Sequence, residues 1–219
     1  MGVTIHRIKQ VYDLYDEVMS GLDFACKKGC AHCCTCNVVL TGLEAHFLLK
    51  HLGPAERKPV LQRIEDQFPP QRYIPKLTTN DFAKACMAGG AIEEEENDPT
   101  WGRCPLLENN ACTVYEYRPF GCRSLMSRQN CAKAGYADIS PLTLTMNNLF
   151  MQFIEHMDQE GISGNLSDLL PALSAQGIET ALKEGRLISN HPIPALMVPP
   201  EHQAPVQEII ARLEQIRTA

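Results

Sequence analysis

The sequence lacks several features that would place it in common functional classes. It has no basic excess: 20 lysines and arginines stand against 26 aspartates and glutamates, a net charge of −6. A nucleic-acid-binding surface usually requires a basic patch, so we expect no nucleic-acid partner. No run of about 18 apolar residues occurs, and such a run is what a membrane-spanning helix needs. We therefore expect no membrane span.

The first residues lack the usual targeting signals. Met1 to Gln10 contain no apolar segment of the kind found in a secretory signal peptide. Gly2 would suit myristoylation, but the motif requires serine or threonine where this chain has His6. We therefore expect a cytoplasmic protein, in a reducing compartment where disulfide frameworks are rare.

The patterns of two large fold classes are also missing. No internal repeat of about 20–50 residues is present, which argues against a solenoid. Strand-like segments do not alternate with helices, so we do not expect a parallel α/β sheet. No glycine-rich nucleotide-binding loop follows a strand, because Gly89-Gly90 comes after a helical pattern and precedes acidic residues.

Most of the chain instead repeats apolar residues at helical spacing. Thr41-Gly42-Leu43-Glu44 is typical of a capping box, and Asn80 is expected to cap a later helix. Glu108-Asn109-Asn110 lies between two short strand-like segments and predicts a β-hairpin. Helices are predicted over residues 6–24, 43–52, 54–67, 80–87, 142–159, 165–173, 175–184 and 205–217.

The predicted fold is therefore mainly α: an irregular helical domain with one small β-hairpin, built around a cysteine-rich metal centre. We expect residues 1–189 to form this metal-binding helical domain. Residues 190–219 would add a proline-rich, extended arm and a C-terminal helix.

Cysteine is the residue that stands out, with ten in the chain. Five lie between Cys26 and Cys36 and four between Cys104 and Cys131, whereas Cys86 stands alone. In a reducing compartment, clustered cysteines are more often metal ligands or catalytic groups than disulfides. Cys36 and Cys86 are expected to pack as small apolar side chains rather than to bind metal. For Cys131 the sequence does not decide between packing and metal binding.

The spacing within both clusters suits thiolate ligation. The first is Cys26-x3-Cys30-x2-Cys33-Cys34, in which Gly29 allows a tight loop and Lys27 and Lys28 add positive charge. The second is Cys104-x7-Cys112-x9-Cys122, on or beside the predicted hairpin. Neither segment alone can complete two coordination shells, so we expect the two clusters to meet in space. His32, inside the first loop, is expected to face solvent.

Both runs resemble one known family. The segment Phe24 to Cys34 with the following Val38 to Ala45, and the segment Cys104 to Arg123, are similar to the two halves of the YkgJ-type cysteine-cluster family. This family is also described as the CxxCxxCC, zinc- or iron-chelating domain. The resemblance covers about residues 24–125, although the first gap here has three residues rather than two.

The resemblance implies a metal site and its ligands. It suggests that the ligands are Cys26, Cys30, Cys33, Cys34, Cys104, Cys112 and Cys122. Because several thiolates make a site anionic, we expect Arg118 and Arg123 to lie beside it and offset that charge. Some family members resemble flagellin lysine N-methylases, so a protein lysine N-methylase-like enzyme is an alternative. The protein partner, if one exists, is unknown.

The metal and a second alternative remain open. Seven thiolates in two groups exceed the four of a zinc knuckle and favour an iron–sulfur cluster. The absence of a ferredoxin-type cysteine run favours zinc. Cys26, Cys30 and Cys33 also match the C-x3-C-x2-C signature of radical S-adenosylmethionine enzymes. The missing βα repeats argue against that enzyme class.

Overall fold

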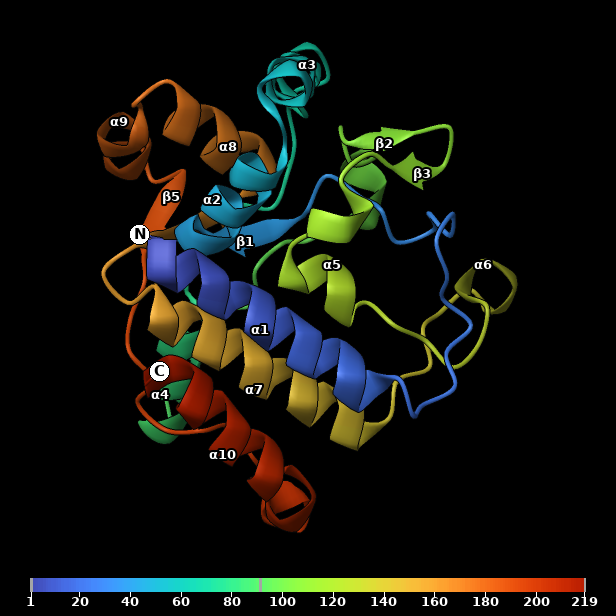
Figure 1. The fold of residues 1–219 in the computed structure, drawn as a ribbon, viewed down its shortest axis with the longest axis vertical. Helices are drawn as coiled ribbons and strands as arrows, with labels where there is room; N and C mark the ends of the chain where they lie inside the picture. The colour runs from blue at the N-terminus through green and yellow to red at the C-terminus, as the bar shows by residue number, and fades with distance from the viewer. Residues whose placement is uncertain (1, 91, 219) are drawn as a thin grey trace.

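The computed structural model describes residues 2–90 and 92–218 and is mainly helical (Figure 1). Its α-helices are α1 (Gly2–Met19), α2 (Gly42–His51), α3 (Pro54–Asp66), α4 (Thr79–Met87), α5 (Phe120–Ser124), α6 (Cys131–Ala134), α7 (Pro141–Met157), α8 (Leu166–Ser174), α9 (Ile178–Lys183) and α10 (Gln203–Thr218). The strands are β1 (Val39–Thr41), β2 (Leu107–Glu108), β3 (Ala111–Cys112), β4 (Ile162–Asn165) and β5 (Leu187–Ser189). Three 3₁₀ turns are η1 (Pro99–Trp101), η2 (Tyr115–Tyr117) and η3 (Pro200–His202).

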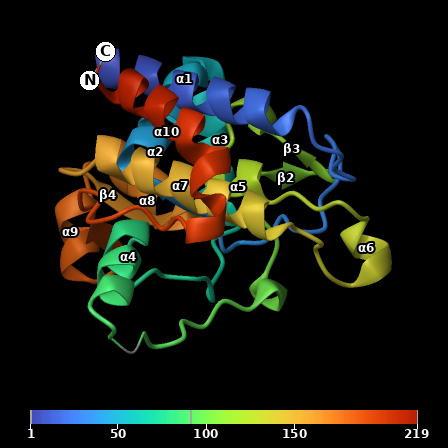
Figure 2. The same cartoon turned by 90° about the horizontal axis from the view of Figure 1, so that it is seen from below.

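Helices α1, α7 and α10 pack side by side around the first hydrophobic core, as Figures 1 and 2 show. Helix α7 is capped by Ser140, whose hydroxyl accepts a hydrogen bond from Thr143 N, and Pro141 is its first residue. Tyr15 of α1 packs edge-on against Phe120 and Phe150, with ring centroids 4.7 and 5.1 Å apart. This packing joins α5 to the core, so the short helix that carries Cys122 has a rigid support.

A second hydrophobic core lies among α2, α3, α8, α9 and a three-stranded antiparallel sheet of order β1-β4-β5. Val39 pairs with Asn165, and Ser163 with Ile188. The sequence predicted one hairpin and no such sheet, so the prediction was incomplete. The strands are three or four residues long, and β1 and β4 each run directly into a helix, which leaves too few residues for a recognisable alternation.

The predicted hairpin is present as β2 and β3, with Leu107 opposite Cys112. Asn109 and Asn110 form its turn with φ angles of 48° and 62°. Asparagine tolerates this left-handed conformation better than most residues, which is why this dipeptide can reverse the chain. The turn places Cys112 next to the segment that begins at Cys104.

The predicted capping box at the start of α2 is also present, and its glutamate bonds to residues outside this helix as well. Glu44 N donates to Thr41 Oγ1 at 3.2 Å, and Thr41 N donates to the Glu44 carboxylate at 2.8 Å. The same buried carboxylate accepts hydrogen bonds from Tyr12 Oη at 2.8 Å and Phe120 N at 2.7 Å. One side chain therefore connects α1, α2 and the start of α5.

Asn80 does not cap α4 as predicted. Thr78 is the cap, and its hydroxyl accepts a hydrogen bond from Asp81 N at 3.1 Å. The side chain of Asn80 turns inward and donates to the carbonyl oxygens of Gln152 and His191. Sequence spacing did not distinguish the two positions because both residue types are good N-caps.

The proline-rich segment after β5 crosses the surface of α7 before the last helix. Gln152 holds it there: its amide donates to Ala195 O at 2.8 Å and accepts from Met197 N at 2.8 Å. Helix α10 then completes the first core with Val206, Ile209 and Leu213. Among the described residues, no helix is both long and apolar enough to cross a membrane.

Candidate metal centre

A cavity of about 1010 Å³ lies beside α5 and is lined by cysteines from three separate parts of the chain. Cys36 and Cys86 do not line it. The described cysteines form no disulfide. The cysteines on the cavity wall are the seven that the sequence singled out, together with one more: Cys26, Cys30, Cys33, Cys34, Cys104, Cys112, Cys122 and Cys131.

The first cysteine cluster occupies the loop between α1 and β1. Figure 1 shows this loop between the hairpin β2–β3 and α6. Gly29, with φ 91°, and a hydrogen bond from Cys30 N to Lys27 O at 2.9 Å form a tight turn. Ala25 N donates to Ser127 O at 2.8 Å, which fixes the start of the loop against the segment that leads into α6.

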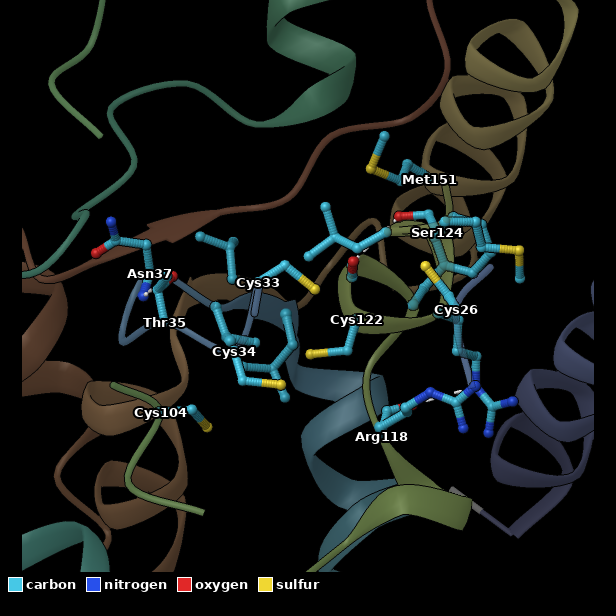
Figure 3. A pocket seen from close by; sticks show the side chains of 18 of the residues that line it. Cys26, Cys33, Cys34, Thr35, Asn37, Cys104, Arg118, Cys122, Ser124 and Met151 are labelled. Atoms are coloured by element: carbon cyan, nitrogen blue, oxygen red, sulfur yellow. Dashed lines mark hydrogen bonds between the residues drawn. The ribbon is translucent and has the colours of Figure 1, made fainter. Parts of the chain in front are cut away.

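The end of the same loop is fixed against the second cluster. Cys104 N donates to Cys34 O at 3.0 Å, and Cys36 N donates to Gly102 O at 3.0 Å. In Figure 3 the sulfur atoms of Cys33, Cys34 and Cys122 point into the same space. Cys104 lies on one side of that space and Cys26 on the other. The two clusters thus meet at one cavity.

The electrostatics of the cavity disfavour thiolates in the absence of a cation. Burial raises the pKa of Cys104 to about 11. Burial, followed by repulsion from Cys104 and Cys112, raises the pKa of Cys122 well above its ordinary value. Interaction between the adjacent thiols of Cys33 and Cys34 raises the pKa of Cys33 and lowers that of Cys34. A metal ion that bound these thiols would displace their protons, so its affinity would increase with pH.

Two cations lie near the hairpin side of the cavity. The guanidinium of Arg118 stacks on the Tyr115 ring at 3.9 Å, and Lys28 lies 5.3 Å from the same ring centroid. Burial raises the pKa of Cys112, and the charges of Arg118 and Lys28 act in the opposite direction. The charge of Arg118 thus acts on a cavity thiol, the role that the sequence predicts for it.

The guanidinium of Arg123 is bonded to groups other than the cysteines. It lines the cavity, but its guanidinium donates to Asp16 at 3.0 Å and to the carbonyl oxygen of Glu116 at 2.6 Å. The same group lies 4.3 Å from the centroid of the Tyr12 ring. Its charge is thus used to join α1 to α5, because a buried guanidinium requires such partners.

The cysteines line the cavity without converging on one point. Within residues 2–90 and 92–218, no three cysteine, histidine, aspartate or glutamate side chains are placed to bind a common ion. His32 is exposed at the edge of the cavity. The chemistry of the wall, eight thiols and a nearby guanidinium, fits a thiophilic metal.

The rest of the cavity wall was not foreseen from the sequence. It includes apolar side chains such as Met151 and Leu77 and the carboxylate of Glu155. Burial raises the pKa of Glu155, while hydrogen bonds from His191 N at 2.9 Å and Asn80 N at 2.8 Å oppose that shift. Leu77 lies far in the sequence from the two α7 residues, Met151 and Glu155, and the three share no motif, so only the folded chain identifies them.

Comparisons with known proteins identify no relative: no family model, no curated protein and no solved structure matches the chain.

Proposed function

We propose that this chain is a metal-binding protein that holds zinc or an iron–sulfur cluster through cysteine thiolates. One observation supports this function above all others. Cysteines from three separate segments line one cavity, whereas Cys36 and Cys86 do not. The reducing cytoplasm assumed for the chain would keep these thiols available for a metal.

The ligands would come from both clusters. Cys34, Cys104, Cys112 and Cys122 surround the hairpin side of the cavity, and Arg118 would offset part of their negative charge. Zinc bound there would fix the loop and hairpin together, whereas an iron–sulfur cluster would supply electron transfer. The resemblance to the YkgJ-type family implies the same type of centre.

A lysine N-methylase-like enzyme is the second candidate, and the size of the cavity supports it. A volume of about 1010 Å³ leaves room for a small molecule next to a metal centre. Calorimetric binding of S-adenosylmethionine would distinguish this enzyme from a metal-binding protein without that cofactor. The radical S-adenosylmethionine alternative gains no support, because every strand pair in the described residues is antiparallel.

The test is metal analysis of protein purified anaerobically. We expect about one or more metal ions per chain, either zinc or iron with acid-labile sulfide. Cys112→Ser should lower this content, because Cys112 lines the cavity and is close enough to Arg118 for that charge to lower its pKa.

Cys86→Ser is the matched control for that variant. Cys86 is exposed on α4 and does not line the cavity, so its replacement should leave the metal content unchanged. The proposal is wrong if the wild-type protein contains no metal and takes up neither zinc nor a cluster after anaerobic incubation with iron and sulfide.

A further inference from the structure

The cavity extends beyond its cysteines. A second part of its wall comes from segments that carry no cavity cysteine, chiefly the chain that leads into α4 and the helix α7. We call this part the α7 wall; it consists of Tyr73, Leu77, Thr78, Met151, Ile154 and Glu155. The whole cavity, at about 1010 Å³, has the size of the largest common small-molecule sites, about 300–1,000 Å³. It therefore has room for an organic ligand besides a metal centre.

Helix α7 supplies the charged group of this wall. Met151, Ile154 and Glu155 are three and four residues apart, so they lie on one face of the helix. In Figure 3 the Met151 side chain appears above Ser124 and the cysteine sulfurs. The residue Glu155 is only 2% exposed. The cavity is thus lined, on this side, by apolar side chains and one buried carboxyl group.

The hydrogen bonds of Glu155 fix its carboxylate without neutralising it. It accepts from Asn80 N and His191 N, and the Thr78 hydroxyl is a further partner. All three donors are uncharged groups. Within residues 2–90 and 92–218, Glu155 forms no ion pair. A buried carboxylate without a counterion is costly, so a cation bound beside it would be stabilised.

The charges around Glu155 also favour a cation. The lysine and arginine residues of the cavity wall, Lys27, Arg118 and Arg123, all lie on segments that carry cysteines and not on the α7 wall. The carboxylate of Asp81 acts on Glu155 and adds negative charge. The ion-pair partner of Asp81 is His191, 3.6 Å away, which is charged only when protonated.

The edge of the cavity near the α7 wall is acidic as well. Asn97 and Pro99 line the cavity, and the loop before them carries the exposed residues Glu93, Glu94 and Glu96. Charge of one sign at the entrance of a cavity attracts ligands of the opposite sign. The acidic loop therefore favours the same cationic ligand as the buried carboxylate.

The apolar surface of the cavity indicates the rest of that ligand. Among the described residues, four of the eight exposed large apolar side chains line this one cavity: Leu22, Leu77, Leu125 and Tyr136. Apolar side chains left in contact with water in a cavity are typical of a ligand site. A ligand with an apolar body would remove part of this surface from water.

We infer that the α7 wall binds a small organic amine, with its cationic nitrogen at Glu155 and its apolar body against Leu77 and Met151. An anion would be repelled by Glu155, and an uncharged apolar molecule would leave this carboxylate without a counterion. The inference goes beyond the proposed metal centre and does not depend on it, because none of these residues is a candidate metal ligand.

The test is calorimetric titration of the full chain, as purified, with three probes of one shape. These are 2-phenylethylamine, 2-phenylethanol and phenylacetate, which differ in charge. We expect the amine to bind at least about 10-fold more tightly than the alcohol, and the carboxylate not to bind measurably. Equal affinity for the amine and the alcohol, or no binding of the amine, would overturn the inference.

Two variants locate the site. Glu155→Gln should reduce the affinity for the amine to that for the alcohol, because it removes the charge. Leu77→Ala should weaken binding of both probes by about 5-fold, because it removes apolar contact from a half-exposed position. Glu160→Gln is the control: Glu160 is exposed, lies just beyond α7 and does not line the cavity, so binding should be unchanged. A full preference for the amine in Glu155→Gln would contradict the assignment.

A second measurement covers the case in which Glu155→Gln does not fold. In NMR spectra of protein labelled with ¹³C at its methionine methyl groups, the amine should shift the Met151 signal. The signal of Met87, exposed on α4 and away from the cavity wall, should not move. A shift of Met87 without one of Met151 would place the amine elsewhere.

Metal analysis of the same samples separates this inference from the proposed function. Glu155→Gln should keep the metal content of the wild type. Selective binding of the amine by protein that takes up no metal would support the amine site and overturn the metal centre. Metal binding without selectivity for the amine would have the opposite meaning.

Discussion

Arg118 is the residue whose charge is best placed to influence the cavity thiols without binding a metal itself. Its guanidinium lies over Tyr115, and it donates a hydrogen bond to Tyr115 O at 2.7 Å, so its position is fixed from two sides. Its charge opposes the upward pKa shifts of both Cys112 and Cys122. Arg118 is thus a positioning and charge-balancing residue in the proposed site.

We therefore predict that Arg118→Gln weakens zinc affinity by about 10-fold, the lower range for residues that support metal ligands. Competition with a chromophoric chelator measures this affinity. Arg118→Lys, which retains the charge, should recover most of the loss. Arg217→Gln, on α10 and away from the cavity wall, is the control and should bind zinc normally. Equal affinity of Arg118→Gln and wild type would remove Arg118 from the site.

Asp158, at the end of α7, makes stability depend on pH. Burial raises its pKa to about 6, while its carboxylate accepts hydrogen bonds from Leu43 N at 3.0 Å and Asn190 Nδ2 at 2.9 Å. The unfolded value is 3.8. Between these two values the folded chain keeps a proton that the unfolded chain has lost. The contribution of Asp158 to stability is therefore greatest at low pH and decreases as the pH rises through 6.

Asp158→Asn should remove this decrease. We compare the free energy of unfolding of the variant with that of the wild type at each pH. This difference should shift in favour of the variant by about 1–3 kcal/mol as the pH rises from 4 to 7. Urea denaturation at a series of pH values measures it, and the difference between the two proteins cancels the other titrating groups. Parallel pH profiles for wild type and variant would show that the carboxyl of Asp158 has an ordinary pKa in the folded protein.

At the scale of elements, the fold depends on one carboxylate that joins three helices. Glu44→Ala would leave the Tyr12 hydroxyl and the backbone amides of Thr41 and Phe120 without a buried acceptor. We expect a loss of about 3 kcal/mol in the free energy of unfolding, measured by urea denaturation. Because Phe120 begins α5, the same change should also weaken metal binding at Cys122.

Glu56 provides a control for this prediction. It makes the carboxylate half of a capping box at the start of α3, where Gly53 N donates to its carboxylate at 3.1 Å, but Gly53 has no side chain to accept a bond in return, and Glu56 is exposed. Glu56→Ala should therefore cost about 0.5–1 kcal/mol. Similar losses for the two variants would mean that Glu44 acts only as a helix cap.

The elements also show which parts of the structure the sequence can predict. Long helices with a continuous apolar stripe, the Thr41 capping box and the Asn109-Asn110 turn each have a local signature, and all are present. The sheet β1-β4-β5 was missed because β1 pairs with β4 across more than a hundred residues of sequence, and because all three strands are too short for a periodic pattern. Helices α5 and α6 were missed for the same reason of length.

The candidate site was predictable only in part for a similar reason. Spacing alone grouped the cysteines of the first cluster and the hairpin, because those residues are close in sequence. Cys131 has no motif around it, and its place at the cavity depends on contacts such as the hydrogen bond from Ala25 N to Ser127 O, which join distant parts of the chain. The different surroundings of Arg118 and Arg123 were also not readable from the sequence, since they depend on where Asp16 and Tyr115 lie.

At the scale of the whole molecule, two hydrophobic cores carry the fold, and neither contains a predicted ligand as a buried member. We therefore predict that removal of the metal leaves the helical fold intact. Far-UV circular dichroism should keep its helical signal after chelation, while the melting temperature falls because a ligand of the folded state is lost. Hydrogen exchange should increase mainly in residues 22–38 and 104–138. A chain that unfolds on chelation would show that the metal is a structural requirement.

The most direct test of the account is X-ray absorption at the metal edge of anaerobically purified protein. Thiolate ligation predicts a first shell of sulfur only, at about 2.3 Å from the metal, with about four sulfurs per ion. Cys86→Ser should give the same spectrum, and Cys112→Ser should lose sulfur from the shell. A shell dominated by nitrogen or oxygen at about 2.0–2.1 Å would contradict a cysteine-bound centre in this cavity.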